Sequence, residues 1–248
     1  MSQLIPQRFD AATGVAFVVL ITAALLLPGR PPKADDSIET ITALLIERRE
    51  AFLFGGYIAG LAAMAFLWFL GGVRDYLRVL GAAELTTAAC ASGTFAITLM
   101  VVGMMMFNGV AFVAARLGDP PLVRALTDTG NGVIEMTKFG FAAFILAVCR
   151  AAAPTGRLPC WLIRFGAGSA VLMVASAVAL FVDHGIFQFG GVIDLGGAIP
   201  AELWIATLSI IMMRGWPDAE VCLSDRVPQP RAWRKRASIE SSRAGGAP

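Results

Sequence analysis

Long apolar runs recur six times along the chain, with short polar segments between them. They cover residues 13–28, 51–72, 85–114, 132–153, 165–187 and 196–213. A helix needs roughly 20 apolar residues to cross a bilayer core about 30 Å thick. Backbone amides in hydrocarbon must be paired within their own segment, so such runs form helices. The alternating segments typical of membrane barrels are absent. The pattern predicts an all-α, polytopic transmembrane bundle of about six helices.

The ends of the chain differ from this helical region, 13–214. Residues 1–12 form a short N-terminal segment, and the polar, proline-containing tail 215–248 is typical of disorder. The first run has only Arg8 before it and no small-residue cleavage site after it, so we expect an uncleaved helix rather than a secretory signal.

Composition agrees with a membrane protein. Apolar residues make up 57% and charged residues 15% of the chain, and the mean hydropathy is +0.71. Soluble domains average about 45–50% apolar and about 25% charged residues. A soluble protein this apolar would lack polar groups to cover its surface. The net charge of +2 gives no sign of a nucleic-acid partner.

The distribution of Lys and Arg predicts the orientation. Thirteen of them fall on the side of the two termini and six on the other side, although without the tail the counts are seven and six. Because positive loops stay inside, we expect cytoplasmic N- and C-termini in a plasma membrane. Arg231, Arg234, Lys235 and Arg236 in the tail either contact anionic lipid headgroups or only set the topology.

Ionisable or strongly polar residues in the apolar runs are the candidates for a functional site, because they are costly in hydrocarbon. They are Asn108, Glu135, Lys138, Asp183, His184, Asp194 and Glu202. From the predicted helix ends, Glu135 would lie about 4–5 Å and Lys138 about 9 Å below the outer surface. The sequence thus predicts that all seven gather in the outer third to half of the membrane.

Two interpretations of this cluster stay open. Glu135 and Lys138 are three residues apart and can pair on one helix face. With His184, and with a helix broken at Pro200, they would line a vestibule for a cation or small polar solute, or a proton relay. Alternatively, Glu135 and Lys138 only neutralise each other, and the remaining residues face water at the interface.

Other chemistry has little support in the sequence. The four cysteines form no CxxC pair, and HExxH, GxSxG and P-loop motifs are absent. We expect no enzyme, metal or cofactor. Met100 and Met104–Met106 are better explained as packing than as a copper site.

Small residues one turn apart predict close helix contacts. Gly56 and Gly60, Gly166 and Ala170, and Gly197 and Ala201 form such pairs. We expect them to pack the bundle within one chain, with self-association as a lesser alternative. The amphipathic stretch 36–50 either lies on the outer membrane surface or extends the second helix.

Two sequence runs resemble a family of uncharacterised actinobacterial membrane proteins. One is Gly55-Gly-Tyr-Ile-Ala-Gly-Leu-Ala-Ala-Met-Ala-Phe-Leu-Trp-Phe-Leu-Gly-Gly-Val-Arg74, and the other is Arg157-Leu-Pro-Cys-Trp-Leu162. The resemblance covers residues 50–215. It implies a six-helix domain of unknown function and no activity. We therefore expect a scaffold or accessory membrane protein, or alternatively a small-solute, ion or proton-linked transporter that uses the polar cluster.

Overall fold

The computed structural model describes residues 4–29, 36–114, 117–181 and 192–214, and all of its regular elements in these ranges are helical. The elements are α1 (Leu4–Leu26), α2 (Ile38–Glu47), α3 (Arg49–Val79), α4 (Ala83–Gly109), the π-helix η1 (Val110–Ala114), α6 (Pro120–Ala152), the 3-10 helix η2 (Ala153–Thr155), α7 (Cys160–Ser176), the 3-10 helix η3 (Ala177–Phe181) and α8 (Val192–Arg214). The predicted all-α class is confirmed.

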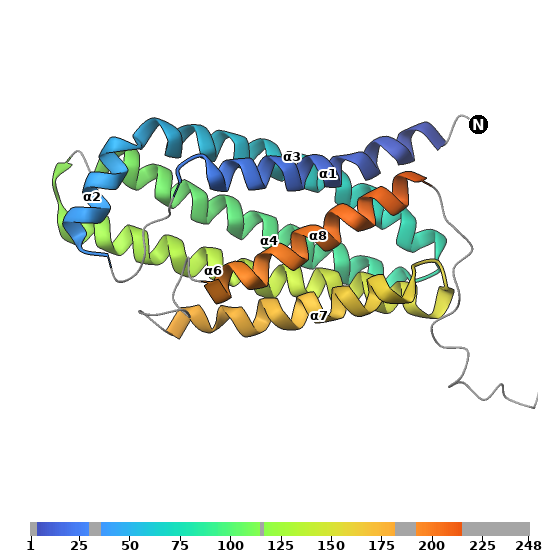
Figure 1. The fold of residues 1–248 in the computed structure, drawn as a ribbon. Helices are drawn as coiled ribbons and strands as arrows, with labels where there is room; N and C mark the ends of the chain where they lie inside the picture. The colour runs from blue at the N-terminus through green and yellow to red at the C-terminus, as the bar shows by residue number, and fades with distance from the viewer. Residues whose placement is uncertain (1–3, 30–35, 115–116, 182–191, 215–248) are drawn as a thin grey trace, which may run out of the picture.

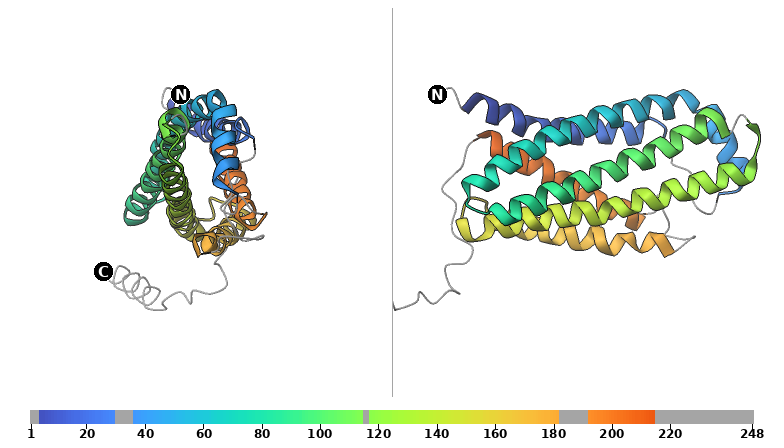
Figure 2. Two further views of the ribbon diagram at one scale, coloured as in Figure 1. Left: turned by 90° about the vertical axis from the view of Figure 1, so that its left-hand side faces the viewer. Right: turned by 180° about the vertical axis from the view of Figure 1, so that it is seen from behind.

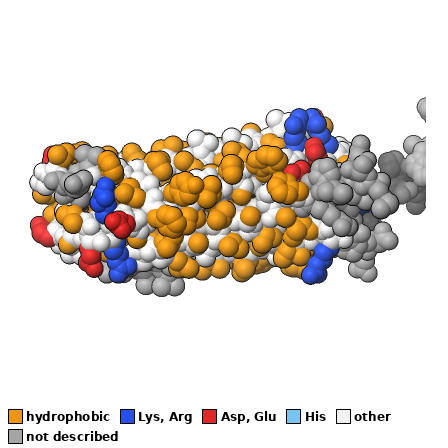
Figure 3. Space-filling model, turned by 90° about the horizontal axis from the view of Figure 1, so that it is seen from above, with side chains coloured by type: hydrophobic (Ala, Val, Ile, Leu, Met, Phe, Trp, Pro, Cys, Tyr) orange, Lys and Arg blue, Asp and Glu red, His pale blue; other side chains and the backbone are white. Residues whose placement is uncertain are grey.

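Six of these helices are long and apolar enough to cross a bilayer: α1, α3, α4, α6, α7 and α8. They run side by side in an elongated bundle, and α8 crosses its neighbours diagonally (Figures 1 and 2). Hydrophobic side chains cover the middle of the face seen in Figure 3, whereas acidic and basic side chains lie toward its two ends. This pattern is that of a multi-pass membrane protein.

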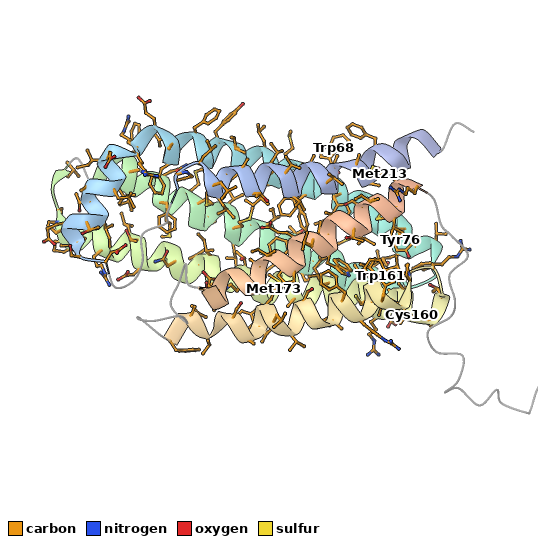
Figure 4. All side chains as sticks on the ribbon, in the orientation of Figure 1. Trp68, Tyr76, Cys160, Trp161, Met173 and Met213 are labelled. Carbon is orange, nitrogen blue, oxygen red and sulfur yellow. The ribbon has the colours of Figure 1, made fainter. Side chains whose placement is uncertain are left out.

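The two ends of the bundle are distinct. At one end α1 begins and α8 finishes, and we call it the termini end (Figure 1). The short helix α2 lies across the opposite end, which we call the α2 end. Exposed Trp161 lies at the start of α7, near the termini end (Figure 4). An exposed tryptophan there suits an interfacial anchor.

Helix α6 begins twelve residues before the predicted start at residue 132. Asp119 caps it, accepting a hydrogen bond from the Leu122 backbone amide at 3.2 Å, and Pro120 occupies the first position. The first turns are polar and exposed, with Arg124 paired to Asp128 at 2.9 Å. The apolar run therefore identifies the part of α6 that suits a bilayer core, whereas the helix itself begins earlier, in the polar residues before that run.

Other helix ends also differ from the predicted ones. Helix α1 begins at Leu4 rather than at 13, and α3 continues to Val79 rather than stopping at 72. The predicted break at Pro200 is wrong, because α8 runs through this proline. A transmembrane helix tolerates an internal proline when neighbouring groups satisfy the freed carbonyl.

Helix α2 packs on protein instead of extending α3. Ser37 caps its start by accepting from the Thr40 backbone amide at 3.3 Å. Arg48 separates the two helices. The apolar side of α2 joins a small core at the α2 end, made of Ile41, Leu45, Phe52, Phe107, Val110, Ala111 and Val123. Burial in this core fixes α2 across the bundle.

The main core is aromatic and lies toward the termini half of the bundle. Phe66 packs against Phe17, Phe141 and Phe144 with ring centroids 4.7–5.7 Å apart, and Phe144 also contacts Trp204 at 6.2 Å. We call Phe17, Phe66, Phe69, Phe141, Phe144 and Trp204 the aromatic core; all six are buried. Edge-on aromatic pairs add about 0.5–1.5 kcal/mol beyond area burial.

Small residues bring the helix backbones together, as predicted. A Cβ added to Gly56 would meet Asn108, one at Gly166 would meet Trp204, and one at Gly197 would meet Ser176, each at 2.4 Å or less. Gly60 is the exception, with nothing within 4 Å. The methionines of α4 are partly core and partly surface, since Met104 is buried and Met105 exposed, which agrees with a packing role.

A charged site inside the bundle

Three charged side chains meet in the interior between α6 and α8. The Lys138 ammonium group donates to Glu135 Oε2 at 2.7 Å and to Asp194 Oδ1. Glu135 is 1% exposed, Lys138 4% and Asp194 8%. The predicted Glu135–Lys138 pair is therefore present, and Asp194 completes it. We call these three residues the charged triad.

The triad lies near the middle of the apolar part of α6. The nearest exposed charged residues on this helix are Asp128 and Arg150, on either side. They are 22 residues apart, which is about 33 Å of helix and close to a bilayer core. Lys138 lies about 15 Å from Asp128 and about 18 Å from Arg150 along the axis.

The predicted start of this helix was wrong, because α6 begins at Pro120 and not at residue 132. The apolar run had been taken as the whole helix. The depth of Glu135 and Lys138 in the membrane stays a prediction. Charged groups are costly wherever they lie in hydrocarbon.

Local structure brings the three groups together. Glu135 and Lys138 are i,i+3 neighbours on α6, so their side chains share one face. Asp194 is in the first turn of α8, where free backbone amides favour a carboxylate. Gly197 lets this end of α8 approach α7 closely, since a Cβ there would meet Ser176. The approach of α8 places Asp194 beside Lys138, 56 residues away in sequence.

The triad combines two carboxylates with one ammonium group. Because both carboxylates contact the same ammonium group, they lie on the order of 5 Å apart or less. Glu135 Oε1 is buried and has no hydrogen-bond partner. Removing one partner of a buried ion pair costs about 3–5 kcal/mol, so the two carboxylates depend on the Lys138 ammonium group that they share.

A polar stripe on α6 leads from the α2 end to the triad. Thr127, Asn131, Glu135 and Lys138 follow one another at spacings of one helical turn, and all four are at most 6% exposed. Asn131 Oδ1 is a second buried acceptor without a hydrogen-bond partner. Sequence reasoning missed Asn131 because it fell outside the predicted helix. The four-residue spacing of positions 127, 131 and 135 was the signal that pointed to it.

The remaining predicted residues do not join the triad. Glu202 on α8 accepts a hydrogen bond from Thr22 of α1 at 3.2 Å. Asn108 lies near the end of α4 beside Gly56 of α3. Asp183 and His184, and the tail residues Arg231, Arg234, Lys235 and Arg236, lie outside the described residues.

Helix α8 is thus tied to three neighbours by polar contacts. Asp194 binds Lys138 of α6, and Glu202 binds Thr22 of α1. Trp204 Nε1 donates to the Leu162 carbonyl of α7 at 3.0 Å. Interhelical polar contacts of this kind average about 0.6 kcal/mol in a membrane. Together they hold α8 in one register against the bundle.

Two hollows on the described part of the chain are open depressions at the α2 end. One is lined by residues from Glu50 to Tyr57 on α3, and the other by Leu27 and residues from Ile46 to Ala51. Neither is lined by α6. Within the described ranges, no three His, Cys, Asp or Glu side chains are grouped to hold a metal ion.

Comparison with known proteins adds no relative. No family model, curated protein or solved structure matches this chain. The resemblance to actinobacterial membrane proteins stays a prediction. The charged triad and its surroundings are therefore the features from which a function can be inferred.

Proposed function

We propose that this integral membrane protein is a transporter linked to protons or a monovalent cation, with the charged triad as its charge-carrying site. The observation that carries the proposal is a buried Glu135–Lys138–Asp194 group within the apolar bundle of six candidate membrane-spanning helices. Each charge at the centre of a membrane helix costs at least about 2.5–3.5 kcal/mol, so intramembrane ionisable residues mark ion or proton pathways by default.

The surface charge supports an orientation in which the termini end is cytoplasmic. Its exposed basic residues outnumber its exposed acidic ones: Arg74, Arg78, Arg150, Arg157, Arg164 and Arg214 against Asp75 and Glu84. Among the described residues of the α2 end the balance is the opposite: Glu39, Glu47, Glu50, Asp119 and Asp128 are exposed acids, and Arg48 and Arg124 are the bases with exposed side chains. By the positive-inside tendency, the α2 end would face outward from a plasma membrane. The basic tail would then reach anionic lipid on the cytoplasmic side.

A scaffold or accessory role is the second candidate. The polar contacts of α8 with α1, α6 and α7 favour it, because they would serve equally to lock a rigid bundle. In that case the triad only holds α6 and α8 together, and removing its charges together should change the stability of the protein little. This difference makes the two candidates separable by one set of variants.

The test uses Glu135→Gln, Lys138→Met and the double variant, each purified and reconstituted in proteoliposomes. Proton and Na⁺ flux are measured with an imposed pH or ion gradient, and stability is measured in detergent. If the triad carries charge, Glu135→Gln remains folded and loses most of the flux. If it only holds the two helices together, the double variant regains the stability that Lys138→Met loses, and no variant or wild-type protein shows flux.

The matched control is the exposed pair on the same helix. Arg124→Met with Asp128→Asn removes one base and one acid from the polar end of α6, where the side chains are 39% and 50% exposed. Flux equal to wild type is expected from this control. Equal losses of flux in the control and in Glu135→Gln would contradict a specific role for the triad.

A further inference from the structure

Two arginines stand next to each other where α2 ends and α3 begins. Arg48 is exposed and Arg49 is half-buried, and neither forms an ion pair with a carboxylate in the part of the chain that the structure describes. The Nε atom of Arg49 is buried and has no hydrogen-bond partner. An unsatisfied buried donor costs about 1–3 kcal/mol, and more if it is charged. An oxyanion bound against these guanidinium groups would lower that cost.

Contacts with the protein hold both guanidinium groups in place. Arg48 Nη1 donates to the Pro28 carbonyl at 2.9 Å. Gly29 has a φ of +77° and leaves room for the same nitrogen, since a Cβ there would meet it. The Arg49 Cζ atom lies 5.0 Å from the centre of the Phe112 ring in η1. An arginine stacked on a ring keeps the edges of its planar fork available for a phosphate, so these two are prepared for one.

Both arginines line one of the two hollows at the α2 end, and two acids line it with them. The remaining residues of this hollow are Leu27, Ile46, Glu47, Glu50 and Ala51. Two positive and two negative side chains match a ligand that carries both charges, a phosphate for the arginines and an ammonium for the glutamates. Helix α3 also begins here without a side-chain cap, and the amides of an uncapped first turn favour a phosphate.

The second hollow continues from the first along α3 and is mostly apolar. It shares Glu50 and Ala51 with the first and adds Leu53, Phe54 and Tyr57. Phe54 and Tyr57 are 56% and 64% exposed, and their stacked rings have centroids 6.4 Å apart. Because α3 is a candidate membrane span, this face meets the acyl chains of the bilayer. A charged hollow followed by an apolar one suits an amphiphile whose headgroup precedes its chains.

We propose that the start of α3 binds a zwitterionic phospholipid at the α2 end of the bundle (Figure 1). The phosphate diester lies against Arg48 and Arg49, the ammonium group lies against Glu47 and Glu50, and the chains follow the apolar hollow. Free phosphate shares the arginine chemistry, but it lacks both the ammonium group and the chains. This site is independent of the charged triad and of the function proposed for it.

The test measures the thermal stability of the delipidated full-length protein in detergent as a ligand is added. A ligand that binds the folded state raises the melting temperature in a saturable way. The probes are a short-chain phosphatidylethanolamine, the phosphatidylglycerol with the same chains, glycerophosphoethanolamine and inorganic phosphate. The variants are Arg49→Gln and the double variant Glu47→Gln with Glu50→Gln. The matched control is Arg78→Gln, which removes an exposed arginine from the other end of α3.

Phosphatidylethanolamine should stabilise wild type and Arg78→Gln equally and bind both more tightly than phosphatidylglycerol does. Its apparent Kd should rise about tenfold or more in Arg49→Gln, because a charge-assisted hydrogen bond to the phosphate is lost. In the double glutamate variant the preference for phosphatidylethanolamine over phosphatidylglycerol should disappear. Glycerophosphoethanolamine and inorganic phosphate should bind wild type far more weakly than the lipid, because they bury no chains.

The proposal is overturned if phosphatidylethanolamine stabilises Arg49→Gln as well as it stabilises wild type. Inorganic phosphate that binds as tightly as the lipid would instead assign a free-phosphate site, and equal binding of the two lipids by wild type would remove the role of the glutamates. Should Arg49→Gln fail to fold, native mass spectrometry of wild type in an equal mixture of the two lipids replaces it. One retained phosphatidylethanolamine per chain supports the site, and retention without preference contradicts it.

Discussion

The two halves of α6 show how one helix serves two different interiors. From Thr127 to Lys138 its buried face is polar, and from Phe141 to Phe144 it is aromatic. The polar half has two buried acceptor atoms without hydrogen bonds, and a group of two carboxylates around one ammonium. The aromatic half is packed ring against ring. The two regions of α6 therefore contribute differently. The aromatic region stabilises the bundle by packing, whereas the polar region buries charged groups, which lowers the stability of the fold.

The largest effect that would separate the halves is expected from Lys138→Met. It leaves two buried carboxylates without the ammonium group that they share, and removing one partner of a buried ion pair costs about 3–5 kcal/mol. Denaturant unfolding in detergent micelles measures this loss. Adding Glu135→Gln should restore a large part of it. A Lys138→Met protein as stable as wild type would show that the triad is not charged as described.

A smaller effect is expected in the aromatic half from Phe144→Leu. The side chain is fully buried between Phe66, Phe69 and Trp204, and leucine keeps most of its volume, so the cost should be about 1–1.5 kcal/mol. The same unfolding assay applies. Flux should be unchanged in this variant. A loss of flux would mean that the two halves are not independent.

The smallest effect is expected at the exposed start of α6. The Asp128→Asn substitution should change the unfolding free energy by about 0.5 kcal/mol or less, because it weakens only an exposed i,i+4 pair and leaves the Arg124 hydrogen bond to the Asp36 carbonyl in place. Raising the salt concentration should shrink even that difference. A change above about 1 kcal/mol would show that the polar half depends on its surface charges.

Much of the fold was predictable from local pattern. The six apolar runs correspond to six long helices, because hydrocarbon thickness fixes how many apolar residues a span needs. Helix ends were less predictable. Helix α6 begins among polar residues, with Asp119 as its cap and Pro120 at its first position. Hydropathy does not reveal such a start, and only the capping residues indicate it. That error placed Asn131 outside the predicted helix.

The candidate site was only partly predictable. The pairing of Glu135 with Lys138 follows from helical spacing alone. The contact of Asp194 with Lys138, and the separation of Glu202 and Asn108 from them, depend on how α8 and α4 are rotated and shifted against their neighbours. Membrane helices are similarly apolar on many faces, so hydropathy does not set those rotations.

By itself, the sequence determined that the chain forms six membrane-spanning helices and that a few ionisable groups must be buried among them. Both follow from the cost of leaving backbone amides or charges in hydrocarbon. Only the tertiary structure decided which of those groups meet. Close contacts such as Gly140 on Ala96 and Gly197 on Ser176 set the helix registers, and these registers place Asp194 of α8 beside Lys138 of α6.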